Sequence, residues 1–148
     1  MKLENDFTDM ISYLIEFDCR FIVVGGFALA FNGFIRNTGD IDFFVEPTIK
    51  NSEKVFNALK SFGAPIQDIN PHDFTQKGTI YQIGLPPIRI DIINSIDGVS
   101  FEEAYATKKI KKIDGLKVPY LSIELLKKNK TASGRSKDLF DIEELNKL

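Results

Sequence analysis

The chain has 148 residues, 43% of them hydrophobic, and a formal net charge of −2. This length and composition suffice to bury a core without disulfides, so we expect a single domain over residues 1–148. The acidic pI of about 5.5 argues against a dedicated nucleic-acid-binding domain. A lone cysteine, Cys19, excludes an internal disulfide, and no apolar run approaches the roughly 18 residues of a membrane span, so we expect a cytoplasmic protein with no membrane partner.

The first half of the chain alternates between helical and strand patterns. Asn5 and Asp6 can cap a first helix, and Gly63 can end a later one. The predicted elements are, in order, a helix over about 7–15, a buried strand at 21–24, a short helix at 27–31, a strand from Asp40, and a helix from Asn51 to Gly63.

The second half begins with a polar loop, residues 64–78, and then returns to short elements. Pro86-Pro87 joins two strands, Ser100 and Glu103 form a capping box, and Asp114-Gly115 is a strong hairpin signal. The predicted elements are strands at 79–85 and 88–93, a short helix from Ser100, a hairpin within 108–118, and helices at about 123–130 and 137–147. This order predicts an α/β (α+β) domain with a mixed sheet flanked by helices.

Asp40 and Asp42 stand at the head of a hydrophobic strand. Side chains alternate between the two faces of a strand, so both carboxylates point the same way while Ile41 and Phe43 point into the core. Two adjacent carboxylates repel each other, and a divalent cation removes that cost. An isolated Asp-x-Asp is also common at solvated strand edges. The pair therefore indicates a metal site only in combination with the residues around it.

Those neighbours suit phosphate chemistry. Gly25 and Gly26 precede the short helix and allow a close approach of the backbone to triphosphate oxygens, although a glycine pair alone is usually a turn. Arg36 and Thr38 lie in the loop that leads to Asp40. All of these residues fall within one strand, helix, strand unit, which predicts a nucleotide-binding site.

Asp91 is a third candidate carboxylate. It lies in an apolar strand where Ile90 and Ile92 share one face and Arg89 shares the other face with Asp91. A charge in such a strand is normally paired, hydrogen-bonded or bound to metal. If this strand lies beside the strand of Asp40 and Asp42, the three carboxylates converge and can hold two Mg²⁺ ions. The alternative is a salt bridge to Arg36 or a nearby lysine.

Positive charge is concentrated near the C-terminus. Residues 107–137 contain ten Lys or Arg but only two acidic residues, a local charge of +8 that leaves −10 for the rest of the chain. This basic flank suits a phosphate backbone, or is simply a solvated face. Lys130 and Arg135 stand near the turn at Gly134 and are candidate ligands for nucleotide phosphates, or decoration of helix ends.

Taken together, Gly25-Gly26, the run Arg36-x-Thr38-x-Asp40-Ile41-Asp42 and the later Asp91 resemble the nucleotidyltransferases of the DNA polymerase β type. Residues 83–91 and the segment from Lys130 to Asp141 are similar to small bacterial members, the AbiEii-type toxins. The commoner family pattern has Gly-Ser where this chain has Gly25-Gly26, a departure that resembles the AbiEii-type and lincosamide-modifying branches.

The resemblance implies a nucleotidyltransferase fold and a Mg²⁺-dependent enzyme. Asp40, Asp42 and Asp91 would be the catalytic and metal-binding residues, and Gly25, Gly26, Arg36, Thr38, Lys130 and Arg135 would bind the NTP. The implied acceptor is an RNA such as tRNA in a toxin-like reaction, and the alternative is a small molecule, as for antibiotic-modifying enzymes. A catalytically silent, antitoxin-like subunit is a further alternative. The small size suggests that a cognate protein or a homodimer completes the cleft.

Overall fold

The computed structural model describes residues 2–34 and 39–147. Among these residues no helix is both long enough and apolar enough to cross a membrane. The elements in chain order are α1 (Asn5–Glu16), β1 (Phe21–Val24), α2 (Gly25–Phe31), β2 (Asp40–Val45), α3 (Ile49–Phe62), the 3₁₀ turn η1 (Asp73–Thr75), β3 (Ile80–Leu85), β4 (Ile88–Ile93), α4 (Phe101–Ala106), β5 (Lys109–Ile113), β6 (Leu116–Tyr120), α5 (Ile123–Ser133) and α6 (Ser136–Asn146).

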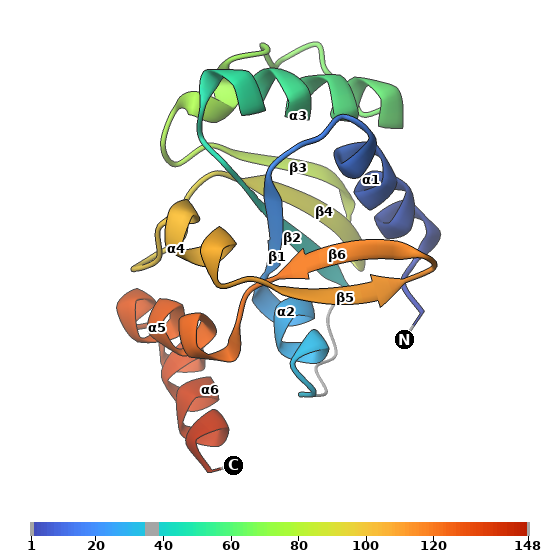
Figure 1. Ribbon diagram of the computed structural model, residues 1–148. Helices are drawn as coiled ribbons and strands as arrows, with labels where there is room; N and C mark the ends of the chain where they lie inside the picture. The colour runs from blue at the N-terminus through green and yellow to red at the C-terminus, as the bar shows by residue number, and fades with distance from the viewer. Residues whose placement is uncertain (1, 35–38, 148) are drawn as a thin grey trace.

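Six strands form one mixed sheet in the order β3-β4-β2-β1-β6-β5 (Figure 1). The β2–β4 and β1–β6 pairs are parallel, whereas β1–β2, β3–β4 and β5–β6 are antiparallel. The mixed sheet predicted from the sequence is therefore confirmed. It places β2 and β4, the strands with the candidate carboxylates, side by side.

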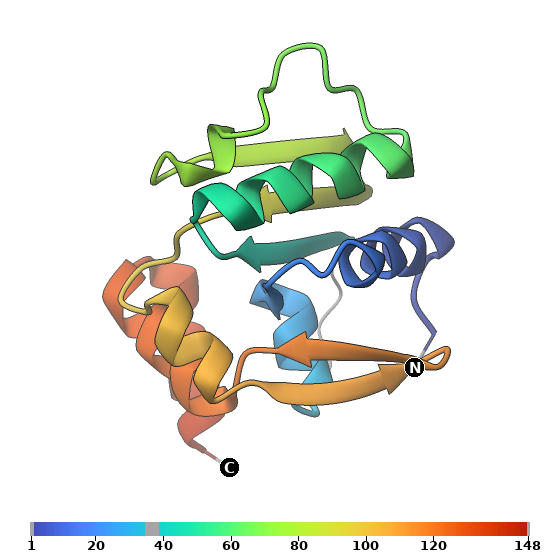
Figure 2. The same ribbon diagram turned by 45° about the horizontal axis from the view of Figure 1, so that its top comes forward.

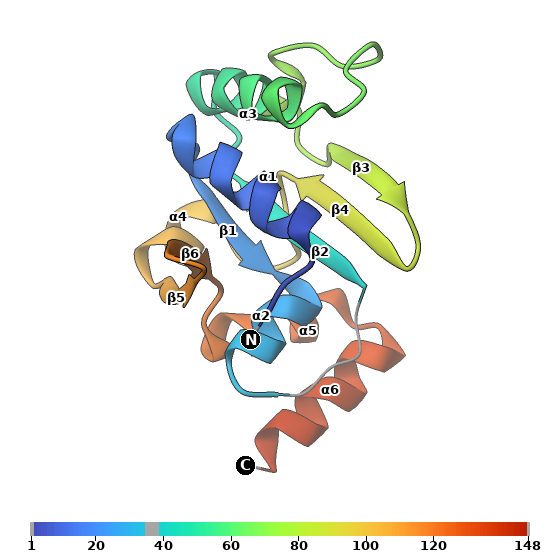
Figure 3. The same cartoon turned by 90° about the vertical axis from the view of Figure 1, so that its right-hand side faces the viewer.

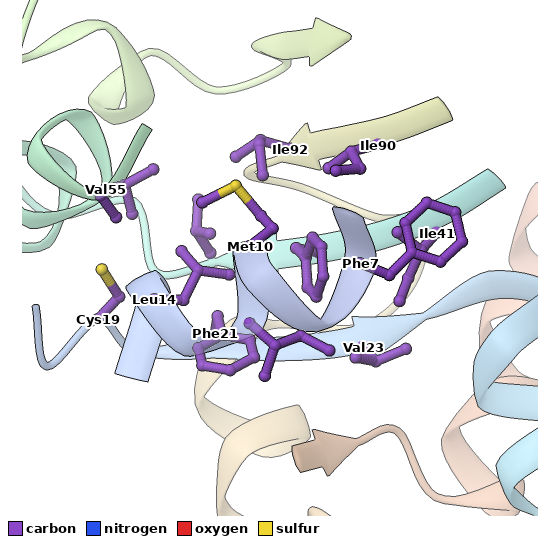
Figure 4. Packing of buried hydrophobic residues seen from close by; sticks show 14 of the residues in the cluster. Phe7, Met10, Leu14, Cys19, Phe21, Val23, Ile41, Val55, Ile90 and Ile92 are labelled. Carbon is purple, nitrogen blue, oxygen red and sulfur yellow. The ribbon is translucent and has the colours of Figure 1, made fainter. Parts of the chain in front are cut away.

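The two faces of the sheet have separate cores. On one face, α1 and α3 cover β2 and β4, as Figure 2 shows. There Phe7, Met10 and Leu14 of α1 pack toward Ile41 and the isoleucines of β4 (Figure 4). On the other face, residues of α2, α4 and α5 pack around Phe44 of β2.

Local chemistry sets most element boundaries. Ser100 and Glu103 form the predicted capping box at α4, and Gly63 ends α3 in the left-handed conformation at φ 95°. Three predicted helix starts were wrong, and α2 begins at Gly25 rather than at Phe27. The N-cap of α1 is Glu4, and α3 begins earlier than predicted because the Thr48 side chain accepts a hydrogen bond from the backbone N–H of Asn51.

Candidate active site

The register of β2 and β4 brings two acids together. In this parallel pair Asp42 is the partner of Asp91, and Asp40 is the partner of Arg89. Registered neighbours lie on the same face of a sheet, here the face opposite α1 and α3. Asp42 and Asp91 are hydrogen-bonded to each other, and Asp91 is 7% exposed.

Arg89 joins the remaining acid to this pair. Its guanidinium lies 2.9 Å (Nε) from Oδ1 of Asp91 and 3.0 Å (Nη2) from Oδ2 of Asp40. A second bond, from Nη2 to Oδ2 of Asp91 at 3.1 Å, makes the Asp91 contact bidentate. Among the described residues, the salt-bridge partner of Asp91 is thus Arg89 of its own strand, and Arg36 lies outside them. Asp40, with a side chain 36% exposed, lies at the solvent side of this network.

The electrostatics mark Asp42 as the unusual member. Burial, followed by the charge and hydrogen bond of Asp91 and then the charge of Asp40, raises the pKa of Asp42 from 3.8 to about 7, against the opposing effect of Arg89. A bound cation would stabilise the ionised form of Asp42, because it would neutralise the charges of both acids. Perturbed acids of this kind are common at functional sites.

Gly25 presses the backbone against this carboxyl group. It opens α2 directly after Val24, the β1 residue that pairs with Asp42. Its φ is +70°, and a Cβ at this position would overlap Oδ2 of Asp42. Both the positive φ and the short distance to Asp42 therefore favour a glycine at this position. Gly26 is the second residue of α2.

The remaining residues that were predicted to bind the nucleotide lie in different parts of the chain. Arg36 and Thr38 lie outside the described residues. Lys130, on α5, is buried, and its Nζ lies 3.0 Å from Oδ2 of Asp141 on α6. Arg135 is exposed and occupies the N-cap position of α6. The sequence showed no sign that Lys130 is buried, because its partner lies on the next helix.

The donor set fits a divalent cation at Asp42 and Asp91. Carboxylate oxygens are the ligands that Mg²⁺ takes from proteins, and the two acids are adjacent. No three Asp, Glu, His or Cys side chains converge on a common point within residues 2–34 and 39–147. Asp40 is held in the network through Arg89, so the arrangement is a carboxyl pair with a third acid beside it.

A cavity of about 470 Å³ extends from the same strand. Phe44, two residues beyond Asp42 and on the same face of β2, lines it together with Ile96, Val99 and Phe101. Lys77 and Ser95 supply polar lining. The cavity thus lies along β2 from the carboxyl pair, by about 7 Å at the rise of an extended strand.

The basic hairpin lies at the far edge of the sheet from β3. Lys109, Lys111 and Lys112 are in β5, and both β6 and β1 separate this strand from β2. Of the other basic residues, Lys128 pairs with Glu103 at 2.8 Å. The β5 lysines therefore lie three strand spacings from Asp42 on β2 and four from Asp91 on β4, roughly 14 and 19 Å.

A mixed sheet that carries acids on two adjacent central strands, with a glycine turn beside them, has the architecture of nucleotidyltransferases. TM1012 from Thermotoga maritima, provisionally assigned as a nucleotidyltransferase, has a similar structure (TM-score 0.62, 15% identity, 95% of this chain and 88% of that chain covered). The lincosamide antibiotic adenylyltransferase LnuA, solved with lincomycin bound, is also similar (TM-score 0.59, 17% identity, 98% and 97% covered). At these identities the likeness shows the nucleotidyltransferase fold.

The sequence comparison gives the family. The profile described as "Nucleotidyltransferase of unknown function (DUF6036)" matches residues 1–146, so the chain belongs to this nucleotidyltransferase family. No curated relative matches at a significant level. The fold predicted from the sequence and its nucleotidyltransferase class are confirmed, while the AbiEii-type branch is not distinguished by these comparisons.

Proposed function

We propose that the chain transfers a nucleoside monophosphate from an NTP to an acceptor hydroxyl and releases pyrophosphate. The observation that carries the proposal is the registered pair of Asp42 and Asp91, with the backbone of Gly25 against the Asp42 carboxyl group. The site offers acids and a close backbone approach, which suits a reaction that depends on positioning and charge neutralisation.

Asp42 and Asp91 would hold Mg²⁺, with Asp40 beside them for a second ion. Bound Mg²⁺ would neutralise the phosphate oxygens and favour ionisation of the acceptor hydroxyl. The acceptor oxygen forms a bond to the α-phosphorus as the bond from that phosphorus to the bridging oxygen breaks. Asp91 would either bind an ion or accept the hydroxyl proton, and the electron pair of the broken bond leaves with pyrophosphate.

Other chain residues would position the nucleotide. Gly25 and Gly26 would let the backbone approach the triphosphate, and Arg36, Thr38 and Arg135 would contact its oxygens. Lys130 belongs to this set by its charge and by the resemblance. Its burial beside Asp141 supports a second role, holding α6 on α5.

The proposed acceptor is an RNA such as tRNA, in a toxin-like reaction of the AbiEii type. The support is the resemblance together with the lysines of β5, which stand free of the sheet core at its edge. Lysine side chains on an exposed edge can follow a phosphate backbone.

A small hydroxylated molecule is the second candidate acceptor, and two observations favour it. LnuA, an antibiotic adenylyltransferase, shares the fold over nearly the whole of both chains. The cavity beside Phe44 has an apolar floor and a few polar groups, as small-molecule sites commonly do.

One experiment separates these acceptors. The purified chain is incubated with Mg²⁺ and α-³²P-labelled NTPs, with total RNA in one reaction and a pool of hydroxylated small molecules in the other. Label on RNA supports the first acceptor, and label on a small compound supports the second. Absence of labelled product and of pyrophosphate in both reactions, for a chain that is folded, would contradict the enzyme and favour a silent antitoxin-like subunit. An Asp91→Asn variant is the inactive control.

A further inference from the structure

The two edges of the sheet differ in chemistry. The β5 edge carries Lys109, Lys111 and Lys112, whereas β3 contains no charged residue. On β3, Ile80 is 64% exposed and Leu85 is 82% exposed. In Figure 3, β3 forms the outer border of the sheet, and α1 and α3 lie to one side of it.

A strand at the edge of a sheet is a template for another strand. Alternate N–H and C=O groups of β3 point away from β4, and in the described part of the chain β4 is the only strand that pairs with β3. Proteins normally protect such edges with lysines, prolines or bulges. The β5 edge has this protection, but β3 lacks charge and displays apolar side chains instead.

We propose that the outer edge of β3 pairs antiparallel with β3 of a second copy of this chain. Two identical strands pair in this way about a two-fold axis, which gives a closed dimer. The absence of charge on β3 means that two copies meet without like-charge repulsion, even though each carries a net charge of −2.

The β3 sequence suits this self-pairing. In a register centred on Gln82, Tyr81 lies opposite Ile83, an aromatic and β-branched pair of the kind that stabilises sheets. In the same register Ile80 lies opposite Gly84, so its exposed side chain covers the position that has no side chain. The polar Gln82 then faces its own counterpart, where two amides can hydrogen-bond.

The dimer would bear directly on the carboxyl site. Gln82 is the β3 residue registered with Asp91 of β4, on the face that carries the acids. The β3 strand of the second copy would lie two strand spacings from Asp91, roughly 10 Å. The second copy would therefore form a wall on the open side of the candidate active site. The dimer does not depend on the reaction proposed above, and its test uses no activity.

Sedimentation equilibrium of the purified chain, from about 1 to 100 µM, tests the dimer over the range of a moderate affinity. The wild type is expected to reach twice the 16.7 kDa of one chain. Ile80→Lys adds a charge at a mostly exposed position, and we expect it to raise the dimer dissociation constant at least about tenfold. The matched control is Ile110→Lys on the β5 edge, where the side chain is 51% exposed, and it should leave the mass unchanged.

Circular dichroism and thermal unfolding establish that both variants are folded. Amide hydrogen exchange provides the second measurement, because β3 amides that point outward should become protected as the wild-type concentration rises. A wild-type chain that remains monomeric throughout this range overturns the proposal and leaves the edge for a strand of another protein. Equal weakening by Ile80→Lys and Ile110→Lys would also overturn it.

Discussion

Asp42 combines three unfavourable conditions for an ionised acid: burial, a hydrogen-bonded neighbour in Asp91, and the nearby charge of Asp40. Arg89 offsets part of this cost through its contacts with Asp91 and Asp40. An arrangement that disfavours its own charges is typical of a site that gives up stability for binding. The consequence is measurable in the chain without any ligand.

The first prediction concerns stability against pH. The folded pKa of Asp42, about 7, lies above its ordinary value of 3.8, so the native state holds a proton that the unfolded chain releases. This contribution to stability is complete below about pH 4 and is lost as pH rises to about 7. Asp42→Asn should flatten that dependence and raise the free energy of unfolding at pH 8 by on the order of 2 kcal/mol.

Urea unfolding in metal-free buffer at a series of pH values measures this effect. Asp9→Asn, at an exposed position on α1, is the matched control and should leave the pH dependence unchanged. An Asp42→Asn variant that is less stable than the wild type at pH 8 would show that the ionised carboxylate is fully compensated by its surroundings.

The second prediction concerns Gly25. In Gly25→Ala the new Cβ would overlap Oδ2 of Asp42, so we expect NTP binding to weaken at least about tenfold, together with a loss of ~1–2 kcal/mol in stability. Gly33→Ala is the matched control, because Gly33 also has a positive φ (+98°) but nothing lies within 4 Å of its would-be Cβ. It should lose stability and keep NTP binding. Titration with a fluorescent NTP measures the binding of both variants. Equal losses of binding would contradict the proposal that Gly25 lets the backbone approach the triphosphate.

The buried pair of Lys130 and Asp141 joins α5 to α6. Lys130→Met removes a charge partner 3.0 Å from a carboxylate that is 5% exposed, so we expect a loss of about 3 kcal/mol. The double variant Lys130→Met with Asp141→Leu should recover part of that loss, because both members of the Lys130–Asp141 pair are then removed.

Urea unfolding of the wild type, both single variants and the double variant completes this cycle. NTP binding by the double variant then tests the phosphate role of Lys130. Restored stability with weak NTP binding supports that role, whereas normal binding assigns Lys130 to the helix contact alone. A double variant as unstable as Lys130→Met would contradict the pairing argument.

Elements with local signals could be predicted from the sequence. The turn at Asp114-Gly115 and the capping box of Ser100 depend on residues within a few positions, and both are present. The shared face of Arg89 and Asp91 also follows from strand alternation. Their contacts with the neighbouring strand do not follow from the sequence, because the register of Asp42 with Asp91 depends on which strand β2 pairs with in the folded chain. Arg89 was therefore missed as a partner of Asp40, although an arginine two residues from Asp91 was the available signal.

The lysines of β5 provide a test that distinguishes the two proposed acceptors. If they follow RNA, changing Lys109, Lys111 and Lys112 to Gln should reduce the slope of log K against log salt by about 2, at ~0.7 per phosphate contact on a single strand. Lys50 and Lys60 on α3, also exposed, provide a matched Gln control that should leave the slope unchanged. Filter binding over a salt series measures it, and an unchanged slope in the β5 variant would contradict RNA tracking by this hairpin.

We propose above all that Asp42 and Asp91 together form the metal and nucleotide site. Mn²⁺, which binds the same oxygen ligands as Mg²⁺, makes that claim measurable by electron paramagnetic resonance without any knowledge of the acceptor. In the presence of an NTP, the wild type and Asp9→Asn should bind Mn²⁺ equally, while Asp42→Asn and Asp91→Asn, each still folded, should bind it at least about tenfold more weakly. Binding of Mn²⁺ by both folded variants with wild-type affinity would contradict the account.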